Sequence, residues 1–178
     1  MPITKISINN FRCFKNLELS LSPGINFFFG SNGSGKTSIL ESVFIFSSGK
    51  SFKSSNLTSL INYDNDKFTL KGFDNKKGYI VEIEKSKNKT ISISLNNNKT
   101  NTNKLVKEFP CTPIHNNTFS FANASPDFRR KLVDRSIFIA EDNFSNAWFS
   151  FYRSLRQRNF LLKNCLLYTS DAADDDTR

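Results

Sequence analysis

One short segment of the chain has residue types and spacing that suit the binding of phosphate. The pattern GxxxxGK(S/T) is matched by Gly30-Ser31-Asn32-Gly33-Ser34-Gly35-Lys36-Thr37. Its glycines allow backbone conformations that turn successive N–H groups toward phosphate oxygens. The Lys36 ammonium would reach the β- and γ-phosphates of a nucleotide, and the Thr37 hydroxyl would be a ligand of the Mg²⁺ that bridges them. The segment therefore predicts a nucleotide-binding loop, or P-loop.

Apolar residues on both sides of this loop predict the elements that position it. The unbroken run 25–29, Ile-Asn-Phe-Phe-Phe, is typical of a strand buried on both faces in the middle of an α/β sheet. Apolar residues then recur at helical spacing from Thr37 to Phe44, so a helix begins near Lys36 and adds the partial positive charge of its N-terminus. A glycine-rich turn that happens to contain a lysine is the alternative, and the strand–loop–helix order favours nucleotide binding.

The remaining apolar spacing predicts strands on both sides of this unit. Alternating apolar residues in 3–8 and 17–21 indicate two strands before the P-loop. The same alternation in 65–95 indicates a small antiparallel sheet inserted after the P-loop helix, and the asparagine-rich stretch 96–103 is expected to be a loop.

Two helices are expected near the C-terminal end, over 125–164. Ser125 suits a helix N-cap, Pro126 the first turn, and Asp127 the positive end of the helix dipole. The buried face of this first helix would consist of Phe128, Leu132, Val133, Ile137 and Ala140. A second helix follows, with an apolar stripe formed by Phe144, Trp148, Phe151, Leu155 and Leu162.

Composition limits the classes of function. The 178 residues carry 25 Lys plus Arg against 16 Asp plus Glu, a net charge of +9 that favours polyanionic partners such as nucleic acid. The 19 Phe argue for a packed core. One histidine and three widely spaced cysteines leave little for zinc, disulfide or His-based catalytic chemistry. The sequence offers neither a membrane-spanning run nor a signal peptide, which leads us to expect a cytoplasmic protein without a membrane partner.

The last residues differ in composition from those before them. Residues 165–178 contain four Asp and two Ala and resemble translated sequencing-adapter sequence, so we expect them to be non-native; a native acidic tail is the alternative. Without their four Asp and one Arg, the net charge rises from +9 to +12. We therefore expect 1–164 to be the native part.

Several blocks, taken in order, resemble the RecF family of bacterial recombination and repair proteins, which are relatives of the SMC-type ABC ATPases. The blocks are Asn10-Phe-Arg12, Leu21–Phe27, Gly33–Glu41, Gly49–Lys53, Ser125–Arg130 with Asp134, and Ser154–Asn159. The resemblance covers about 1–164 and implies the N-terminal part of an ABC-type ATPase head with the α/β fold of P-loop NTPases. Two strands before the P-loop fit such a head better than a small-molecule kinase.

The resemblance implies an ATP-dependent DNA-binding protein of recombinational repair and replication that dimerises with ATP between two heads. It also implies action on single-stranded or gapped DNA, RecO and RecR mediator partners, a role in the SOS response, and a weak DNA-dependent ATPase in the full-length relative. By this resemblance Gly30–Thr37 bind ATP with Mg²⁺, and Arg12 contacts the nucleotide; a salt-bridged surface arginine is the alternative for Arg12. The candidate contacts to the DNA backbone are Lys50, Lys53, Arg129, Arg130 and Lys131, against the alternatives of a solvated face or pairing within the head.

Two departures bear on activity. Where the family has a Pro-Glu pair near the Q-loop, this chain has 115–119, His-Asn-Asn-Thr-Phe, and no residue is assigned there. An apolar strand ending in acidic residues, the Walker B feature, is not found in 105–164, and the acidic run 174–176 belongs to the suspect tail. We therefore expect a fragment that binds nucleotide weakly at most and does not turn it over. The alternatives are an ATP-binding subunit of another ABC or SMC assembly and a P-loop phosphotransferase.

Overall fold

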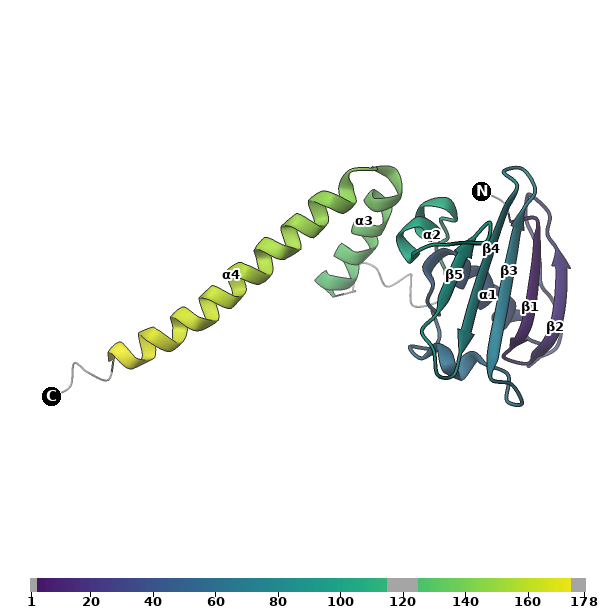
Figure 1. Cartoon of the computed structure of the whole chain (residues 1–178), viewed down its shortest axis with the longest axis horizontal. Coiled ribbons are helices and arrows are strands. Elements are labelled where there is room, and N and C mark those ends of the chain that lie inside the picture. The colour runs from purple at the N-terminus through teal and green to yellow at the C-terminus, as the bar shows by residue number, and fades with distance from the viewer. Residues whose placement is uncertain (1–2, 115–124, 174–178) are drawn as a thin grey trace. The chain divides into compact units, whose positions relative to one another are not determined.

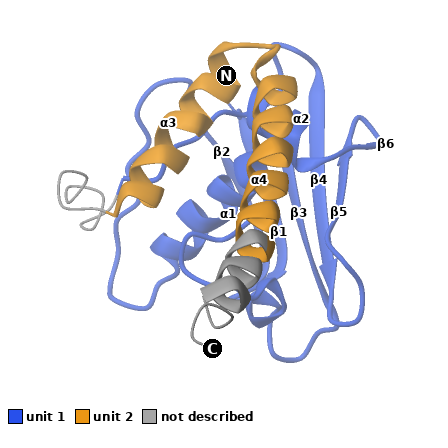
Figure 2. Cartoon of the chain, turned by 90° about the vertical axis from the view of Figure 1, so that its left-hand side faces the viewer, with its two compact units in different colours: residues 1–122 blue, residues 123–178 orange. Residues whose placement is uncertain are grey.

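The computed structural model describes residues 3–114 and 125–173, with side chains as far as Asn164. The chain divides into two compact units, unit 1 with residues 1–122 and unit 2 with residues 123–178 (Figure 2). Unit 1 contains the strands and the predicted P-loop, and unit 2 consists of helices.

Unit 1 is built on a single antiparallel sheet of six strands in the order β2-β1-β3-β4-β5-β6 (Figure 1; β6 is labelled in Figure 2). The strands are β1 (Lys5–Phe11), β2 (Phe14–Ser20), β3 (Lys67–Asp74), β4 (Tyr79–Ser86), β5 (Ser92–Leu95) and β6 (Asn98–Lys99). β1 to β5 lie where alternation predicts strands. The sheet after the P-loop helix is not separate, however, because β3 pairs with β1, with Ile8 opposite Leu70. The two predicted sets of strands therefore form one continuous sheet.

The helix that follows the loop, α1 (Lys36–Ser48), lies against one face of this sheet (Figure 1). Ile45 and Phe46 on α1 are fully buried. A Cβ at Gly72 of β3 would come within 3.4 Å of the Phe46 ring, so the missing side chain lets this ring pack closely on the sheet. The inward side chains of the strands that complete the core are Ile6, Ile8, Phe68, Leu70, Val81 and Ile83. This apolar burial, at about 1.5–3 kcal/mol for each large side chain, fixes the position of the P-loop helix.

The asparagine-rich stretch after β5 is more ordered than a simple loop. Asn96 and Asn97 have positive φ angles of 50° and 64°, as a two-residue hairpin turn requires, and they join β5 to β6. The stretch then enters α2 (Thr102–Glu108), whose N-cap Asn101 accepts a bond from the Lys104 N–H. A short 3₁₀ helix, η1 (Leu57–Leu60), lies between α1 and β3.

The segment before the P-loop differs from its prediction. Residues 25–29 form no strand, and Ile25, Phe27 and Phe29 are 79%, 82% and 94% exposed. Phe28 alone packs against the core. The physical reason is pairing: a strand buried on both faces needs neighbours, and within the described residues no strand pairs with this segment.

Unit 2 contains α3 (Pro126–Ala140) and α4 (Phe144–Ala173). The predicted N-cap is confirmed, because the Ser125 hydroxyl accepts a bond from the Phe128 N–H at 3.4 Å. The predicted burial of the α3 apolar face is wrong for the described residues: none of α3 is buried, and Phe128 and Val133 are exposed. A helix stripe is buried only where another element covers it.

Helix α4 continues through residue 173 without a break at the expected native boundary of 164. A helical backbone does not distinguish native from adapter-derived sequence, so the non-native origin of 165–178 stays a prediction. None of the helices in the described part of the chain combines the length and hydropathy that crossing a membrane requires.

Candidate functional site

The predicted P-loop connects the exposed segment 25–29 to α1, and its glycines have the special conformations that the motif implies. Gly33 and Gly35 have φ angles of 85° and 91°, in the left-handed region. A Cβ at Gly35 would lie 2.3 Å from Cζ of Phe14 and 2.9 Å from Sγ of Cys13. The turn between β1 and β2 therefore packs directly on the loop, and only glycine fits at this position.

The Lys36 side chain folds back over the loop. Its Nζ donates to the carbonyl oxygen of Gly30 at 2.7 Å and to that of Ser31 at 2.8 Å. These two bonds tie the first residues of the loop to the first turn of α1. The ammonium is thus held at the loop backbone, where a bound phosphate would also lie.

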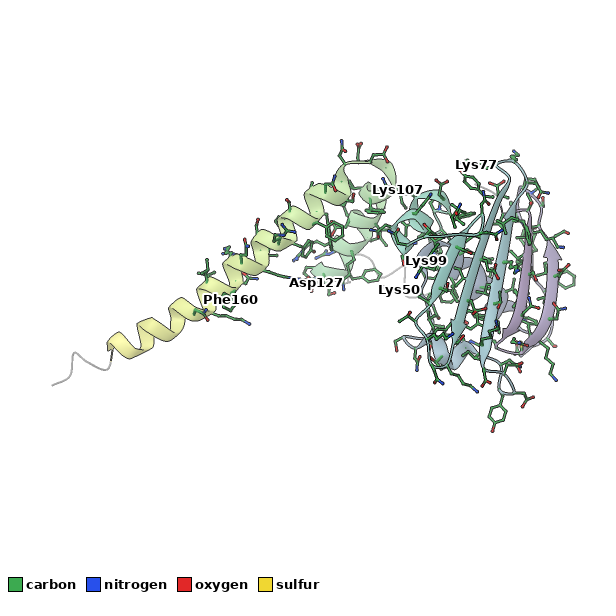
Figure 3. All side chains as sticks on the ribbon, in the orientation of Figure 1. Lys50, Lys77, Lys99, Lys107, Asp127 and Phe160 are labelled. Atoms are coloured by element: carbon green, nitrogen blue, oxygen red, sulfur yellow. The ribbon has the colours of Figure 1, made fainter. Side chains whose placement is uncertain are left out.

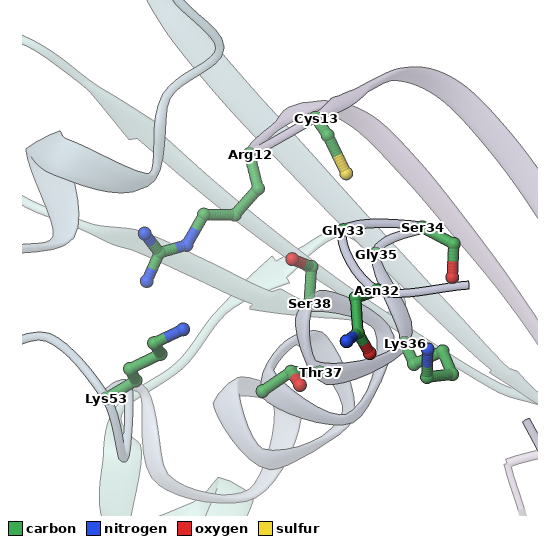
Figure 4. Close-up of a pocket in the computed structure, with 10 residues that line it drawn as sticks. All are labelled: Arg12, Cys13, Asn32, Gly33, Ser34, Gly35, Lys36, Thr37, Ser38 and Lys53. Carbon is green, nitrogen blue, oxygen red and sulfur yellow. The ribbon is translucent and has the colours of Figure 1, made fainter. Parts of the chain in front are cut away.

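A cavity of about 420 Å³ opens above the loop and the start of α1 (Figure 4). Its lining is Arg12, Cys13, Asn32, Gly33, Ser34, Gly35, Lys36, Thr37, Ser38 and Lys53. Figure 4 shows Arg12 and Lys53 extending toward one another across the cavity. Three cations and no carboxylate line it among the described residues, so the cavity suits a polyanion. The predicted Mg²⁺ ligand Thr37 is exposed and borders the same space.

Arg12 forms the salt bridge that the sequence left open as one alternative, and it also lies beside the P-loop cavity. It forms a two-bond ion pair with Glu41 of α1: Nε donates to Oε2 at 3.1 Å and Nη2 to Oε1 at 3.0 Å. It also lines the cavity. The pairing within the chain is therefore present, and the contact to a nucleotide stays a prediction.

Sequence reasoning missed the residues that support these cations. Glu41 is 1% exposed, and its Oε1 also accepts a bond from the hydroxyl of Ser51. A signal was present, because Glu41 is a charged residue within the apolar spacing of the P-loop helix. Cys13 and Ser38, which border the cavity, had no signal in the motif itself.

The five candidate DNA contacts have different environments. Lys53 lines the P-loop cavity, which differs from the DNA surface expected for it. Arg130 pairs with Asp127 on α3 at 3.3 Å, which is the alternative considered for it. Lys50 is exposed on unit 1 (Figure 3), and Arg129 and Lys131 are exposed on α3 in unit 2. These three remain available to a polyanion.

Two sets of residues singled out by the sequence lie outside the described residues, namely 115–119 near the Q-loop position and the acidic run 174–176. Within the described ranges, no group of three or more His, Cys, Asp or Glu side chains is placed to hold a metal ion. Thr37 is thus the only metal ligand that the sequence and this part of the structure suggest.

Residues 5–167 match the model of a protein family described as "AAA domain". Among curated proteins, the chain is 35% identical over 172 residues to the DNA replication and repair protein RecF of Aliivibrio fischeri (strain MJ11) and 35% identical over 173 residues to RecF of Actinobacillus succinogenes. The alignments cover 94% and 95% of this chain and 48% of each relative. The chain therefore spans about half the length of the curated relatives it matches.

Solved structures of RecF and of an SMC ATPase are also similar to this chain. The structure of the recombination mediator protein RecF with ATPrS, from the RecFOR pathway, matches with a TM-score of 0.76 and 27% identity over 90% of this chain and 44% of that one. An SMC ATPase from a study of ATP-driven dimerisation matches with a TM-score of 0.58 and 19% identity, covering 75% of this chain and 98% of that one. The second match bears on the fold alone. Together they support the ABC-type ATPase head predicted from the sequence.

Proposed function

The chain belongs to the AAA-domain family of P-loop proteins and resembles the N-terminal half of RecF, and we propose that it binds ATP as part of a DNA replication and repair protein. The observation that carries this proposal is the cavity at the P-loop, where Arg12, Lys36 and Lys53 meet the N-terminus of α1. Fixed cations and backbone N–H groups without an opposing carboxylate favour a triphosphate. A solved RecF structure with ATP, 26% identical to this chain, supports the choice of nucleotide.

The residues present fit ATP with Mg²⁺. The loop backbone would hold the phosphates, and the Lys36 ammonium would exchange its bonds to the loop carbonyls for bonds to phosphate oxygens. The Thr37 hydroxyl would be a ligand of Mg²⁺, which neutralises phosphate charge when bound. Arg12 and Lys53 would reach the phosphates from the opposite wall of the cavity (Figure 4). The contact of Lys53 with the DNA backbone stays a prediction from the sequence.

Calorimetric titration of the 178-residue chain with MgATP tests the proposal, with Lys36→Ala as the decisive variant. Removing charge-assisted hydrogen bonds at about 1.5–3 kcal/mol in total raises the dissociation constant about 10- to 100-fold. Lys99→Ala makes the same change of charge at an exposed position on β6 (Figure 3) and leaves the affinity unchanged. Equal affinities for the wild type and Lys36→Ala would contradict ATP binding at this loop.

We also propose that the chain contributes to DNA binding, as the names of its RecF relatives imply for a replication and repair protein. The finer proposals are binding of single-stranded or gapped DNA, an ATP-dependent homodimer, RecO- and RecR-type partners, a role in recombination and the SOS response, and a cytoplasmic location. The net charge of +9 and the exposed cations Lys50, Arg129 and Lys131 support contact with the DNA backbone.

Binding to gapped, single-stranded and duplex DNA across a salt series, with and without ATP, tests this second proposal. Arg129→Ala lowers the affinity for all sequences and reduces the salt slope by about one unit. Arg130→Ala is the matched control on the same helix and has a smaller effect, because its charge is paired with Asp127. If the DNA affinities of the wild type and Arg129→Ala depended equally on salt, Arg129 would not contact the DNA backbone.

A further inference from the structure

Glu41 is a buried carboxylate on the P-loop helix whose two oxygens contact two other segments of unit 1. Glu41 is 1% exposed. Its carboxylate accepts hydrogen bonds from Arg12, in the turn between β1 and β2, and from Ser51, in the loop after α1. A buried carboxylate is costly unless it is paired and hydrogen-bonded, and both conditions are met here. The position of Glu41 is therefore tightly coupled to the positions of both partners.

On one side, Glu41 fixes the Arg12 guanidinium. The backbone of Arg12 is itself anchored, since its N–H donates to the Leu60 carbonyl at 2.7 Å and its carbonyl accepts from Nδ2 of Asn62 at 2.8 Å. Its φ of 54° is unusual for a residue with a side chain. The two bonds to Glu41 set the plane of the guanidinium, and they use two of its five N–H donors. Glu41 leaves the other N–H donors of Arg12 unused, and the Arg12 side chain lines the cavity.

On the other side, Glu41 fixes the loop that carries Lys53. The hydroxyl of Ser51 donates to Glu41 and accepts from the backbone N–H of Lys53 at 2.9 Å and from that of Ser54 at 2.8 Å. One hydroxyl thus organises a tight turn of the backbone. The turn directs the Lys53 side chain into the cavity, toward Arg12 (Figure 4).

We propose that Glu41 and Ser51 are positioning residues for the phosphate site: Glu41 orients Arg12 directly, and through Ser51 it orients Lys53, so that both cations meet the phosphates of the bound nucleotide. This inference rests on the proposed binding of ATP at the same loop. Neither residue lines the cavity, so their effect on the nucleotide passes through the two cations. Preorganised cations bind more tightly because less side-chain freedom is lost on binding.

A double-mutant cycle on Ser51 and Lys53 tests the inference by titration with MgATP. Ser51→Ala and Lys53→Ala each raise the dissociation constant about 5- to 10-fold, the cost of one hydrogen bond of ordinary strength. The dissociation constant of the double variant exceeds that of the weaker-binding single variant by no more than about twofold, because without Ser51 the Lys53 side chain is no longer positioned and contributes little to binding. Ser51→Thr keeps the hydroxyl and restores the affinity to within about twofold of the wild type.

The remaining outcomes are distinct. Unchanged affinity in Ser51→Ala, or two effects that multiply in the double variant, overturns the positioning role while Lys36-dependent ATP binding stands. Absence of ATP binding in the wild type overturns both the inference and the proposed function. Thermal unfolding of each chain identifies a variant that has lost its fold.

Arg12→Lys tests whether Glu41 orients Arg12. The variant keeps the positive charge but loses the two-bond pairing with Glu41, and its affinity for MgATP falls as much as in Ser51→Ala.

Discussion

The P-loop unit and the α3–α4 unit of this chain hold their functional residues by different means. In unit 1, α1 is packed on the sheet, Lys36 bonds back to the carbonyls of the P-loop, and Arg12 is paired with the buried Glu41. In unit 2, none of α3 is buried, and Arg129 and Lys131 extend from an exposed helix. The hydrogen bonds of unit 2 include the Ser125 cap of α3 and one bond that joins the two helices, from Nε1 of Trp148 to Asp134 at 3.0 Å.

This difference separates a built site from a charged surface. A cavity with fixed cations recognises a ligand by geometry, because its groups cannot move away from the phosphates. Exposed cations on a helix attract a polyanion through its charge alone and lose this attraction with added salt. The cavity with fixed cations thus lies in unit 1, where α1 is packed on the sheet, and the exposed cations of α3 lie in unit 2, where none of α3 is buried.

Removal of one large side chain from each unit gives the largest contrast. Phe46 is 0% exposed and packs on the sheet, so Phe46→Ala lowers the free energy of unfolding by about 3–5 kcal/mol. Phe160 of α4 is 64% exposed (Figure 3), and Phe160→Ala changes it by no more than about 0.5 kcal/mol. Urea unfolding followed by far-UV circular dichroism measures both. Similar losses in the two variants would show that α4 is packed in solution.

A glycine substitution in the loop tests whether the site itself is rigid. Gly35→Ala places a Cβ at 2.3 Å from Phe14 in a left-handed conformation, so it costs about 2 kcal/mol of stability and weakens ATP binding at least about 10-fold. Gly78→Ala is the control, with a φ of 64° and no atom within 4 Å of the added Cβ. It costs about 1 kcal/mol and leaves ATP affinity unchanged. Equal ATP affinity in the two variants would indicate that the P-loop is flexible enough to accommodate the added Cβ.

Features with a local sequence signal are predicted well, in the P-loop and outside it. The P-loop, β1 to β5 and the Ser125 cap follow from local rules of spacing and turn chemistry, and the structure has all of them. The exposure of 25–29 and of the α3 face could not be predicted, because burial depends on which elements meet in space. The Glu41–Ser51 bond joins residues on α1 and the loop after it, and no spacing rule predicts that contact.

A cap substitution measures how far unit 2 depends on local hydrogen bonds. Ser125→Ala removes the acceptor for the Phe128 N–H and costs α3 about 1 kcal/mol. Ser136→Ala is the control in the same helix; its hydroxyl bonds back to the Leu132 carbonyl, and the change to alanine is neutral or slightly stabilising. Trp148, the only tryptophan, reports on unit 2 by fluorescence during unfolding. No difference between the two variants would assign the stability of α3 to contacts other than its cap.

The smallest expected effect concerns an exposed ion pair of unit 1, between Lys67 and Glu84 on neighbouring strands at 2.8 Å. The hydrogen bond and charge of Glu84 raise the pKa of Lys67 above its usual 10.5. A raised pKa in the folded state stabilises the fold below the unfolded pKa, and this contribution is lost as the pH rises through the folded pKa. Thermal unfolding of the wild type should therefore show no loss from this pair at neutral pH and a slight loss at pH values above 10.5.

Glu84→Gln removes the charge of Glu84, one of the causes of the raised pKa of Lys67, and so reduces this alkaline loss, which thermal unfolding of the two proteins across the same pH range measures. The effect is small because water and salt screen an exposed pair, unlike the buried pair of Arg12 and Glu41. A destabilisation by Glu84→Gln as large as that of Phe46→Ala would mean that surface charges hold unit 1 together. The contrast with unit 2 would then lie in charge pairing rather than in burial.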